Sequence, residues 1–265
     1  MPKFDLHLNL PLMNAAGSLG FFPDPRGPLD LDCLGAFITS PISLTPRTPA
    51  RLPRFLPFPG GALLHTGYPN HGLGYVLRHY AAYWARAPLP VIVHLLSDQP
   101  HQIVQMVERL EIQEGVTAVE IGLPDEMQAG LARDMAAAAQ GELAVVMRLP
   151  LHRALELAPV VLEAGAAAIS LAPPRGALPG QNGELVRGRL YGPTLFPQAL
   201  AVVQALAKAD LPVIGAGGIY TPEQAKAMLR AGAQAVQLDT VLWRGDWQAD
   251  AADFQMQDIE GEVAE

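Results

Sequence analysis

The stretch PVIGAGGIYTPEQAKAMLRAGAQAVQLDT, residues 212–240, holds two short apolar runs separated by an amphipathic segment. The first run is Pro212–Gly215 and the second is Ala235–Leu238. Between them, Thr221 has the residue type of a helix N-cap and Pro222 that of a first helical position. Apolar strands without a polar face, joined by a helix, are typical of a parallel sheet covered by helices.

The same alternation extends over most of the chain. Further strands are predicted at Leu12–Ala15, Ala36–Thr39, Pro90–Leu95, Ala118–Ile121, Leu143–Leu149 and Ala167–Leu171. Helices are predicted over about Gln99–Gln113, Asp125–Ala139, His152–Ala164 and Phe196–Lys208. Eight strand–helix units in 265 residues predict a single α/β domain, a (β/α)₈ TIM barrel, with active-site groups at the C-terminal strand ends. A doubly wound open sheet is the alternative.

Composition narrows the class of protein. Half of the residues are hydrophobic and 17% are charged, which excludes intrinsic disorder. A net charge of −8 argues against a nucleic-acid partner or an anionic membrane surface. The single cysteine, Cys33, excludes a disulfide framework. Because the chain has neither a long apolar run nor a signal-peptide pattern, we expect a cytoplasmic protein with no membrane segment.

Three segments stand apart from the alternating pattern. The proline-rich region of about residues 41–61 is expected to form a long ordered loop or small subdomain over the barrel mouth. The segment Leu171–Pro193 has the length of a lid or binding loop. The acidic tail, about residues 246–265, is expected to be a short helix that frays. The apolar stretch Phe55–Phe58 allows either a homo-oligomer contact or part of a lid.

A phosphate site is predicted where the last two strands end. Gly217 and Gly218 let an anion approach backbone N–H groups, and Thr240 offers a hydroxyl and an N–H. The negative charge of Asp239 disfavours a phosphate at this site unless its carboxylate points away. Alternatively, the two glycines only turn the chain.

Other strand ends carry further candidates. The small residues Ala15, Ala16 and Gly17 suit either a flat ligand lying on the backbone or an ordinary tight turn. Arg148 ends an apolar strand and needs a partner, either an anionic ligand, the edge of a flavin ring, or Glu120 in a structural ion pair.

The sequence also contains an asparagine and several histidines that are candidates for binding a substrate or a metal. Asn70 either caps the following helix or binds a substrate. The seven histidines have no metal-ligand spacing, so no metal site is expected.

Taken together, these segments resemble the dihydroorotate dehydrogenase family of FMN-dependent (β/α)₈ oxidoreductases of pyrimidine synthesis. The resemblance rests on the order of several short segments: Leu12–Gly17, Gly35–Ser40, Pro46–Arg54, Gly67–Gly72, Val119–Ile121, Arg189–Pro193, Pro212–Ile219 and Ala231–Leu238. It implies hydride transfer from a dihydropyrimidine-like small molecule to FMN. It also implies a set of cofactor-binding residues: Ala15, Ala16, Gly17, Ser40, Arg148, Gly192, Gly217, Gly218, Asp239 and Thr240.

The chain departs from the family pattern at several of these positions. Ser40 and Arg148 stand where the family has lysines, and Asp239 stands where it has a glycine. The segment Gly122–Asp125 matches a loop that in the family carries a cysteine or serine base, but it contains no thiol or hydroxyl. Asp125 is the candidate base in that segment. These departures leave a second hypothesis, a non-catalytic barrel that acts as a binding or assembly subunit.

Overall fold

The computed structural model of the protein describes residues 6, 8–27, 29–181, 183–245, 247 and 251–254. Its main sheet has nine parallel strands, eight of them in the order β1-β13-β12-β9-β8-β7-β6-β2. These eight are β1 Leu12–Asn14, β2 Phe37–Ile38, β6 Val91–Leu96, β7 Val116–Gly122, β8 Ala144–Pro150, β9 Ala168–Ala172, β12 Val213–Ala216 and β13 Ala235–Leu238. The eight predicted strands and the (β/α)₈ barrel are therefore confirmed.

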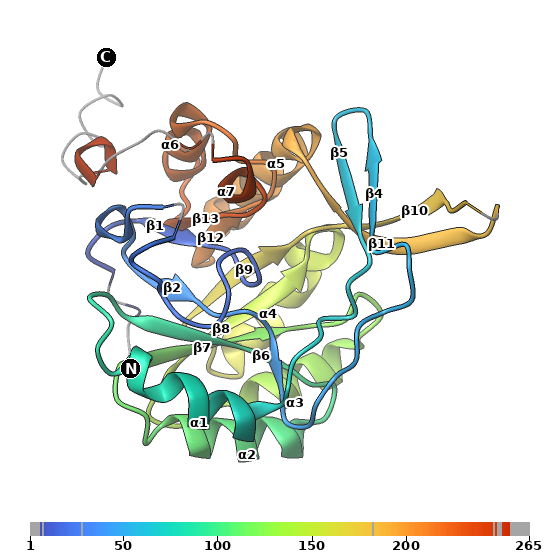
Figure 1. The fold of residues 1–265 in the computed structure, drawn as a ribbon. Helices are drawn as coiled ribbons and strands as arrows, with labels where there is room; N and C mark the ends of the chain where they lie inside the picture. The colour runs from blue at the N-terminus through green and yellow to red at the C-terminus, as the bar shows by residue number, and fades with distance from the viewer. Residues whose placement is uncertain are drawn as a thin grey trace.

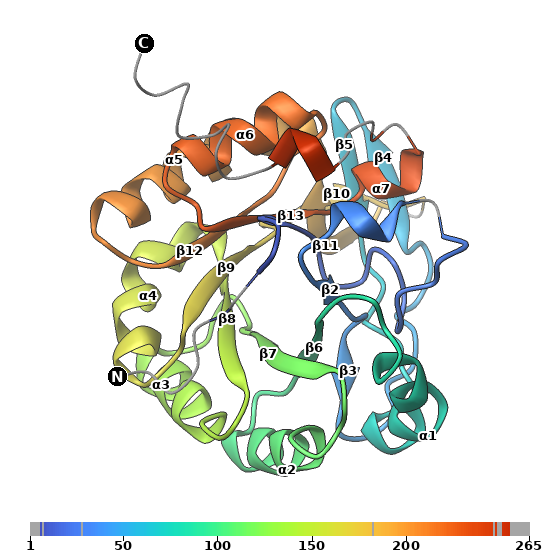
Figure 2. The ribbon, with the colours of Figure 1, turned by 90° about the vertical axis from the view of Figure 1, so that its left-hand side faces the viewer.

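The barrel closes between its first two strands. A parallel bridge joins Met13 to Ala36, and Figure 2 shows the resulting ring of strands seen along the barrel. Asn14 reinforces this seam with its side chain: it donates to the Ile38 carbonyl over 2.7 Å and accepts from the Ile38 N–H over 2.8 Å. A short strand, β3 Ile42–Ser43, also pairs with β6.

Helices surround the ring of strands, as Figure 2 shows. They are α1 Leu73–Trp84, α2 Pro100–Leu110, α3 Ala129–Ala138, α4 Ala154–Glu163, α5 Phe196–Lys208, α6 Pro222–Arg230 and α7 Val241–Arg244. The predicted helices are confirmed, α5 with the predicted bounds and α2, α3 and α4 shorter at their ends. Thr221 and Gln224 form a reciprocal capping box at α6, which confirms the predicted start of that helix.

The first strand–helix unit is irregular, which corrects the expectation of eight complete units. Between β1 and β2 the described residues form no α-helix, and the regular element there is one 3₁₀ turn, Leu31–Cys33. Pro23, Pro25 and Gly27 lie in this connection, and such residues interrupt helical backbone.

A second, four-stranded antiparallel sheet stands beside the barrel mouth, in the order β10-β11-β5-β4 (Figure 1). Its strands are β4 Phe55–Phe58, β5 Gly61–Leu64, β10 Arg175–Pro179 and β11 Leu185–Tyr191. The expected loop over Leu171–Pro193 is thus mostly a β-hairpin, and the region of residues 41–61 ends in another. Pairing of β11 with β5 joins the two hairpins into one four-stranded sheet.

The core has two parts on either side of the strands. The larger cluster fills the space between strands and helices, and a smaller one fills the barrel interior. The smaller cluster includes Ile92, Ala118, Val146, Ala168 and Ala235, one from each of five strands. Of the predicted tail, residues 251–254 form a short 3₁₀ turn, while residues 246, 248–250 and 255–265 lie outside the described residues.

Candidate active site

A layer of polar side chains lies above the apolar layer inside the barrel. Side chains on a strand point to the same face every second residue. Each of the five apolar residues named in the smaller core cluster is followed, two positions later on the same strand, by a polar residue. These polar residues are all at least nine-tenths buried: His94, Glu120, Arg148, Ser170 and Gln237. The strands therefore bring five polar groups together at the C-terminal end of the barrel.

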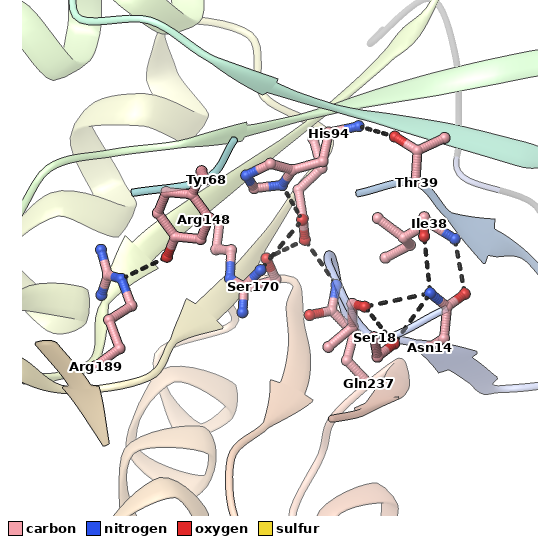
Figure 3. Close-up of polar contacts among 12 residues, drawn as sticks. Asn14, Ser18, Ile38, Thr39, Tyr68, His94, Arg148, Ser170, Arg189 and Gln237 are labelled. Carbon is pink, nitrogen blue, oxygen red and sulfur yellow. Dashed lines mark hydrogen bonds and ion pairs between the residues drawn. The ribbon is translucent and has the colours of Figure 1, made fainter. Parts of the chain in front are cut away.

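Glu120 is hydrogen-bonded to three other members of this layer, His94, Ser170 and Gln237, which are labelled in Figure 3. Its Oε2 lies 2.6 Å from His94 Nδ1. Its Oε1 accepts from Ser170 Oγ at 2.6 Å and from Gln237 Nε2 at 2.7 Å. Because both carboxylate oxygens are bound by donors from three other strands, the carboxylate is fixed in position.

The charge states of this pair follow from its surroundings. Burial raises the pKa of Glu120, but the hydrogen bonds from His94 and Ser170 and the charge of Arg148 outweigh it and lower this pKa to about 2. Burial lowers the pKa of His94, although Glu120 opposes this effect. An ionised carboxylate only accepts hydrogen bonds, so His94 Nδ1 carries the proton that it donates to Glu120.

Arg148 lies close to Glu120 but keeps one buried donor without a partner. Its NH1 lies 3.9 Å from Glu120 Oε2, so the structural ion pair is present. Its Nε is buried without a hydrogen-bond partner. A buried, unpartnered donor is costly, so a polar or anionic ligand would satisfy it.

Two adjoining cavities open above this layer. The first has a volume of about 450 Å³, and Ala15, Ala16, Gly17, Ser40 and Thr240 are among its lining residues. The second, of about 360 Å³, is lined by His94, Gly122 and Arg148 together with residues of the loops above them. Both volumes fall in the range of small-molecule sites, roughly 300–1,000 Å³.

A pair of side chains stands at the junction of the two cavities. Arg189 donates through Nε to the Tyr68 hydroxyl over 3.0 Å, and both residues line both cavities. Arg189 also donates through NH1 to the Pro173 carbonyl over 2.6 Å. Figure 3 shows this pair on the side of Arg148 away from Gln237.

Comparison with known proteins finds relatives over most of the chain. The family model described as dihydroorotate dehydrogenase matches residues 3–163. The catalytic subunit of dihydroorotate dehydrogenase B (NAD(+)) from Citrifermentans bemidjiense is 33% identical over 254 residues, covering 87% of this chain and 82% of that protein. The corresponding subunit from Pelobacter propionicus is 30% identical over 259 residues, covering 89% and 84%. The chain belongs to the dihydroorotate dehydrogenase family. A second family model, described as nitronate monooxygenase, matches residues 101–258.

Within this member of the dihydroorotate dehydrogenase family, the residues expected to bind a cofactor fall into two groups. Ala15, Ala16, Gly17, Ser40, Asp239 and Thr240 line the first cavity together. Arg148 lines the second cavity, and Gly192, Gly217 and Gly218 lie outside the lining of both.

The two glycines after β12 are required for close backbone packing. Gly217 and Gly218 have φ values of 109° and 71°, in the region that favours glycine. A Cβ on Gly218 would lie 2.4 Å from the Phe196 nitrogen and 3.1 Å from the Gly192 oxygen. This packing supports the interpretation that the two glycines turn the chain.

Asp239 does not point away from the predicted phosphate position. Its Oδ1 accepts hydrogen bonds from both the N–H and the hydroxyl of Thr240. The Tyr220 hydroxyl lies 2.7 Å from the same Thr240 oxygen. Burial raises the pKa of Asp239. The donors that Thr240 was expected to offer a phosphate are thus already bound to a carboxyl group.

Asn70 and Asp125 are both engaged within the protein. Asn70 Oδ1 accepts from the Gly72 N–H at 2.9 Å and its Nδ2 donates to Ser43 Oγ at 3.0 Å, an arrangement that shapes the turn before α1. Asp125 forms ion pairs with Arg175 at 3.4 Å and with Arg189 at 3.6 Å. Neither residue is among those that line the two cavities.

Several residues of this site were not singled out in the sequence. His94, Ser170, Gln237, Tyr68 and Arg189 were missed as site residues, and Glu120 was considered only as a partner of Arg148. A usable signal was present, since His94, Ser170 and Gln237 are lone polar residues near the ends of apolar strands. Among the described residues, no group of three or more acidic, histidine or cysteine side chains is arranged to hold a metal ion.

Proposed function

We propose that this chain is an FMN-dependent oxidoreductase of the dihydroorotate dehydrogenase type. It would oxidise a small anionic dihydropyrimidine or a related compound by hydride transfer to the flavin. The proposal is supported by the names of its relatives, which are catalytic subunits of dihydroorotate dehydrogenase B. It depends most on one observation: a cavity with small lining residues adjoins a second cavity rich in cations.

The first cavity suits the flavin. Ala15, Ala16 and Gly17 follow β1 and leave room for a flat ring against the backbone. The phosphate would lie toward Gly217, Gly218 and Thr240, where Asp239 must release the Thr240 donors. When bound, FMN would supply a two-electron acceptor for hydride.

The second cavity suits an anionic substrate. Its lining contains four arginines and one histidine against a single acidic residue: Arg47, Arg148, Arg175, Arg189, His94 and Asp98. Arginine binds carboxylates with paired, directional hydrogen bonds. The unpartnered Nε of Arg148 makes this residue the most buried cation available to a substrate carboxylate.

The relatives' names also suggest a partner. Because they are catalytic subunits, we infer that this chain passes electrons to a second subunit. Homo-oligomer formation and the cytoplasmic location remain predictions. In the described part of the chain, no helix is long and apolar enough to cross a membrane.

Nitronate oxidation is a second candidate reaction. It is favoured by the match of residues 101–258 to the nitronate monooxygenase model. The same cationic cavity would accept a nitronate anion, so the substrates themselves must decide between the two reactions.

The absorption spectrum of the purified protein tests the proposal, recorded before and after incubation with FMN and desalting. We expect a retained flavin band that dihydroorotate, or an alkyl nitronate in the second case, bleaches without oxygen.

Arg148→Gln should raise the KM for the anionic substrate about tenfold or more while keeping the flavin, since a hydrogen bond to a charged group contributes roughly 1.5–3 kcal/mol. Arg133→Gln on the exposed face of α3 is the matched control. A folded protein that retains no flavin would leave the binding-subunit hypothesis in its place.

A further inference from the structure

The imidazole of His94 has one nitrogen bound and one nitrogen available. Nδ1 is hydrogen-bonded to Glu120, and Figure 3 shows the other ring nitrogen pointing away from that carboxylate. In the described part of the chain, no hydrogen bond involves Nε2. His94 lines the second cavity next to Arg148 and Gly122.

Gly122 leaves the space in front of this nitrogen open. A Cβ at position 122 would lie 3.0 Å from His94 Nε2 and 3.1 Å from Cε1. That separation is shorter than a normal carbon–nitrogen contact, so any side chain here would crowd the imidazole. The glycine therefore lets a ligand in the second cavity approach Nε2.

The backbone and Glu120 hold the imidazole in place. The His94 N–H donates to Thr39 Oγ1 over 3.1 Å, which fixes the strand. Glu120 is held by Ser170 and Gln237, so it cannot turn away from Nδ1. With Nδ1 protonated, Nε2 of the neutral ring has a free lone pair directed at the cavity.

We propose that His94 Nε2 is the base that takes a proton from the substrate carbon, and that Glu120 positions it. The inference rests on the proposed function. One C–H bond releases its hydrogen as a proton to Nε2, and the neighbouring C–H bond releases hydride, with two electrons, to the oxidised flavin. A carbon–carbon double bond forms, the flavin is reduced, and His94 returns its proton to solvent. The histidine supplies the function that Gly122–Asp125, without a thiol or hydroxyl, does not.

The groups around His94 set the pH at which it acts. Facing it are Glu120 from β7, Arg148 from β8 and Arg189 from β11, and the cavity adds Asp98, Arg47, Arg175 and Tyr68. Burial and the two nearest arginines lower the pKa of His94, whereas Glu120 raises it. The net effect lowers the pKa of His94, so the ring is neutral at pH 7. The proton-transfer rate should therefore fall only when the pH is below the usual pKa range of histidine.

Deuterium uptake measures this step without net oxidation. The FMN-loaded protein, with its flavin already reduced, is incubated in D₂O with dihydroorotate, and proton NMR follows exchange at the carbon next to the ring carbonyl. His94→Gln should slow exchange at least about 100-fold, the usual contribution of a general base. His101→Gln on the exposed surface of α2 is the matched control and should exchange like the wild type.

Glu120→Gln distinguishes positioning from general stability. Loss of the carboxylate charge should move the acid limb of the exchange rate to lower pH, whereas His94→Gln should remove that limb. Flavin retention and thermal unfolding of each variant show whether it folds.

The proposal is overturned if folded His94→Gln exchanges at the wild-type rate. It is also overturned if the wild type binds orotate, seen as a shift of the flavin band, but shows no exchange. Failure of the proposed function is distinguishable, because it appears as loss of flavin retention. In that case, NMR titration of His94 in the flavin-free protein still tests the dyad: orotate should shift its ring resonances in the wild type, and unchanged resonances would overturn the assignment.

Discussion

Asp239 occupies the two donors of Thr240 that border the predicted phosphate position. Its Oδ1 binds both the N–H and the hydroxyl of that threonine. A carboxylate repels a phosphate that needs the same donors, so binding of the FMN phosphate there would displace or protonate Asp239. Burial raises its pKa and makes the protonated form easier to reach.

We predict that Asp239→Gly strengthens FMN binding about tenfold, because a charge-assisted hydrogen bond contributes roughly 1.5–3 kcal/mol. Binding of riboflavin, which has no phosphate, should stay unchanged. Asp239→Asn removes the charge but keeps a hydrogen-bond acceptor, so its affinity for FMN should lie between those of the wild type and Asp239→Gly. Fluorescence quenching of each flavin gives the dissociation constants, and equal gains for both flavins would contradict the explanation.

At the scale of elements, one buried carboxylate connects the hairpin of β10 and β11 to the barrel. Asp125 pairs with Arg175 from β10 and Arg189 from β11. Its two oxygens have no hydrogen-bond donor in the described residues, so these ion pairs are their compensation. The hairpin in turn holds Arg189 against Tyr68, between the two cavities.

Asp125→Asn should loosen the hairpin and lower the free energy of unfolding by roughly 1–3 kcal/mol, because two cations lose their counter-charge. Hydrogen exchange of residues 175–191 should speed up, while exchange in β6 and β7 should not. Glu126→Gln changes the exposed neighbouring residue in the same way and serves as control. Unaltered hairpin protection would show that Asp125 does not anchor it.

At the scale of the whole molecule, the buried dyad links stability to pH. Glu120 has a pKa of about 2 in the folded state and an ordinary value of 4.5, so its stabilising effect is lost as pH falls below about 4.5. The pKa of His94 is also lowered from 6.5 on folding, so protonation of the unfolded chain begins to favour unfolding below pH 6.5. Both groups therefore lower the free energy of unfolding as the pH falls.

We therefore expect the free energy of unfolding to fall in two stages on acidification, first below pH 6.5 and again below pH 4.5, with a slope of at most about 1.4 kcal/mol per pH unit for each group. Urea titrations at several pH values measure it. His94→Gln should remove the first stage and also reduce the second, because His94 helps to lower the pKa of Glu120. A wild-type stability that is constant from pH 7 to pH 5 would refute the buried neutral histidine.

The sequence by itself determined the barrel. Apolar strands such as Val213–Ala216 and capped helices such as Pro222–Arg230 follow from local periodicity and capping, which are properties of neighbouring residues. The small residues after β1 and the glycines after β12 were placed at the barrel mouth for the same reason. The buried cation Arg148 was identified because a charge in an apolar run is conspicuous.

The tertiary structure alone decided which polar groups meet. His94 and Gln237 are far apart in the chain, and only closure of the barrel brings both to Glu120. The pairing of β11 with β5 is likewise absent from any local pattern. Periodicity reports which face a residue occupies, whereas register and ring closure decide what lies opposite it, because both depend on contacts between segments distant in the chain.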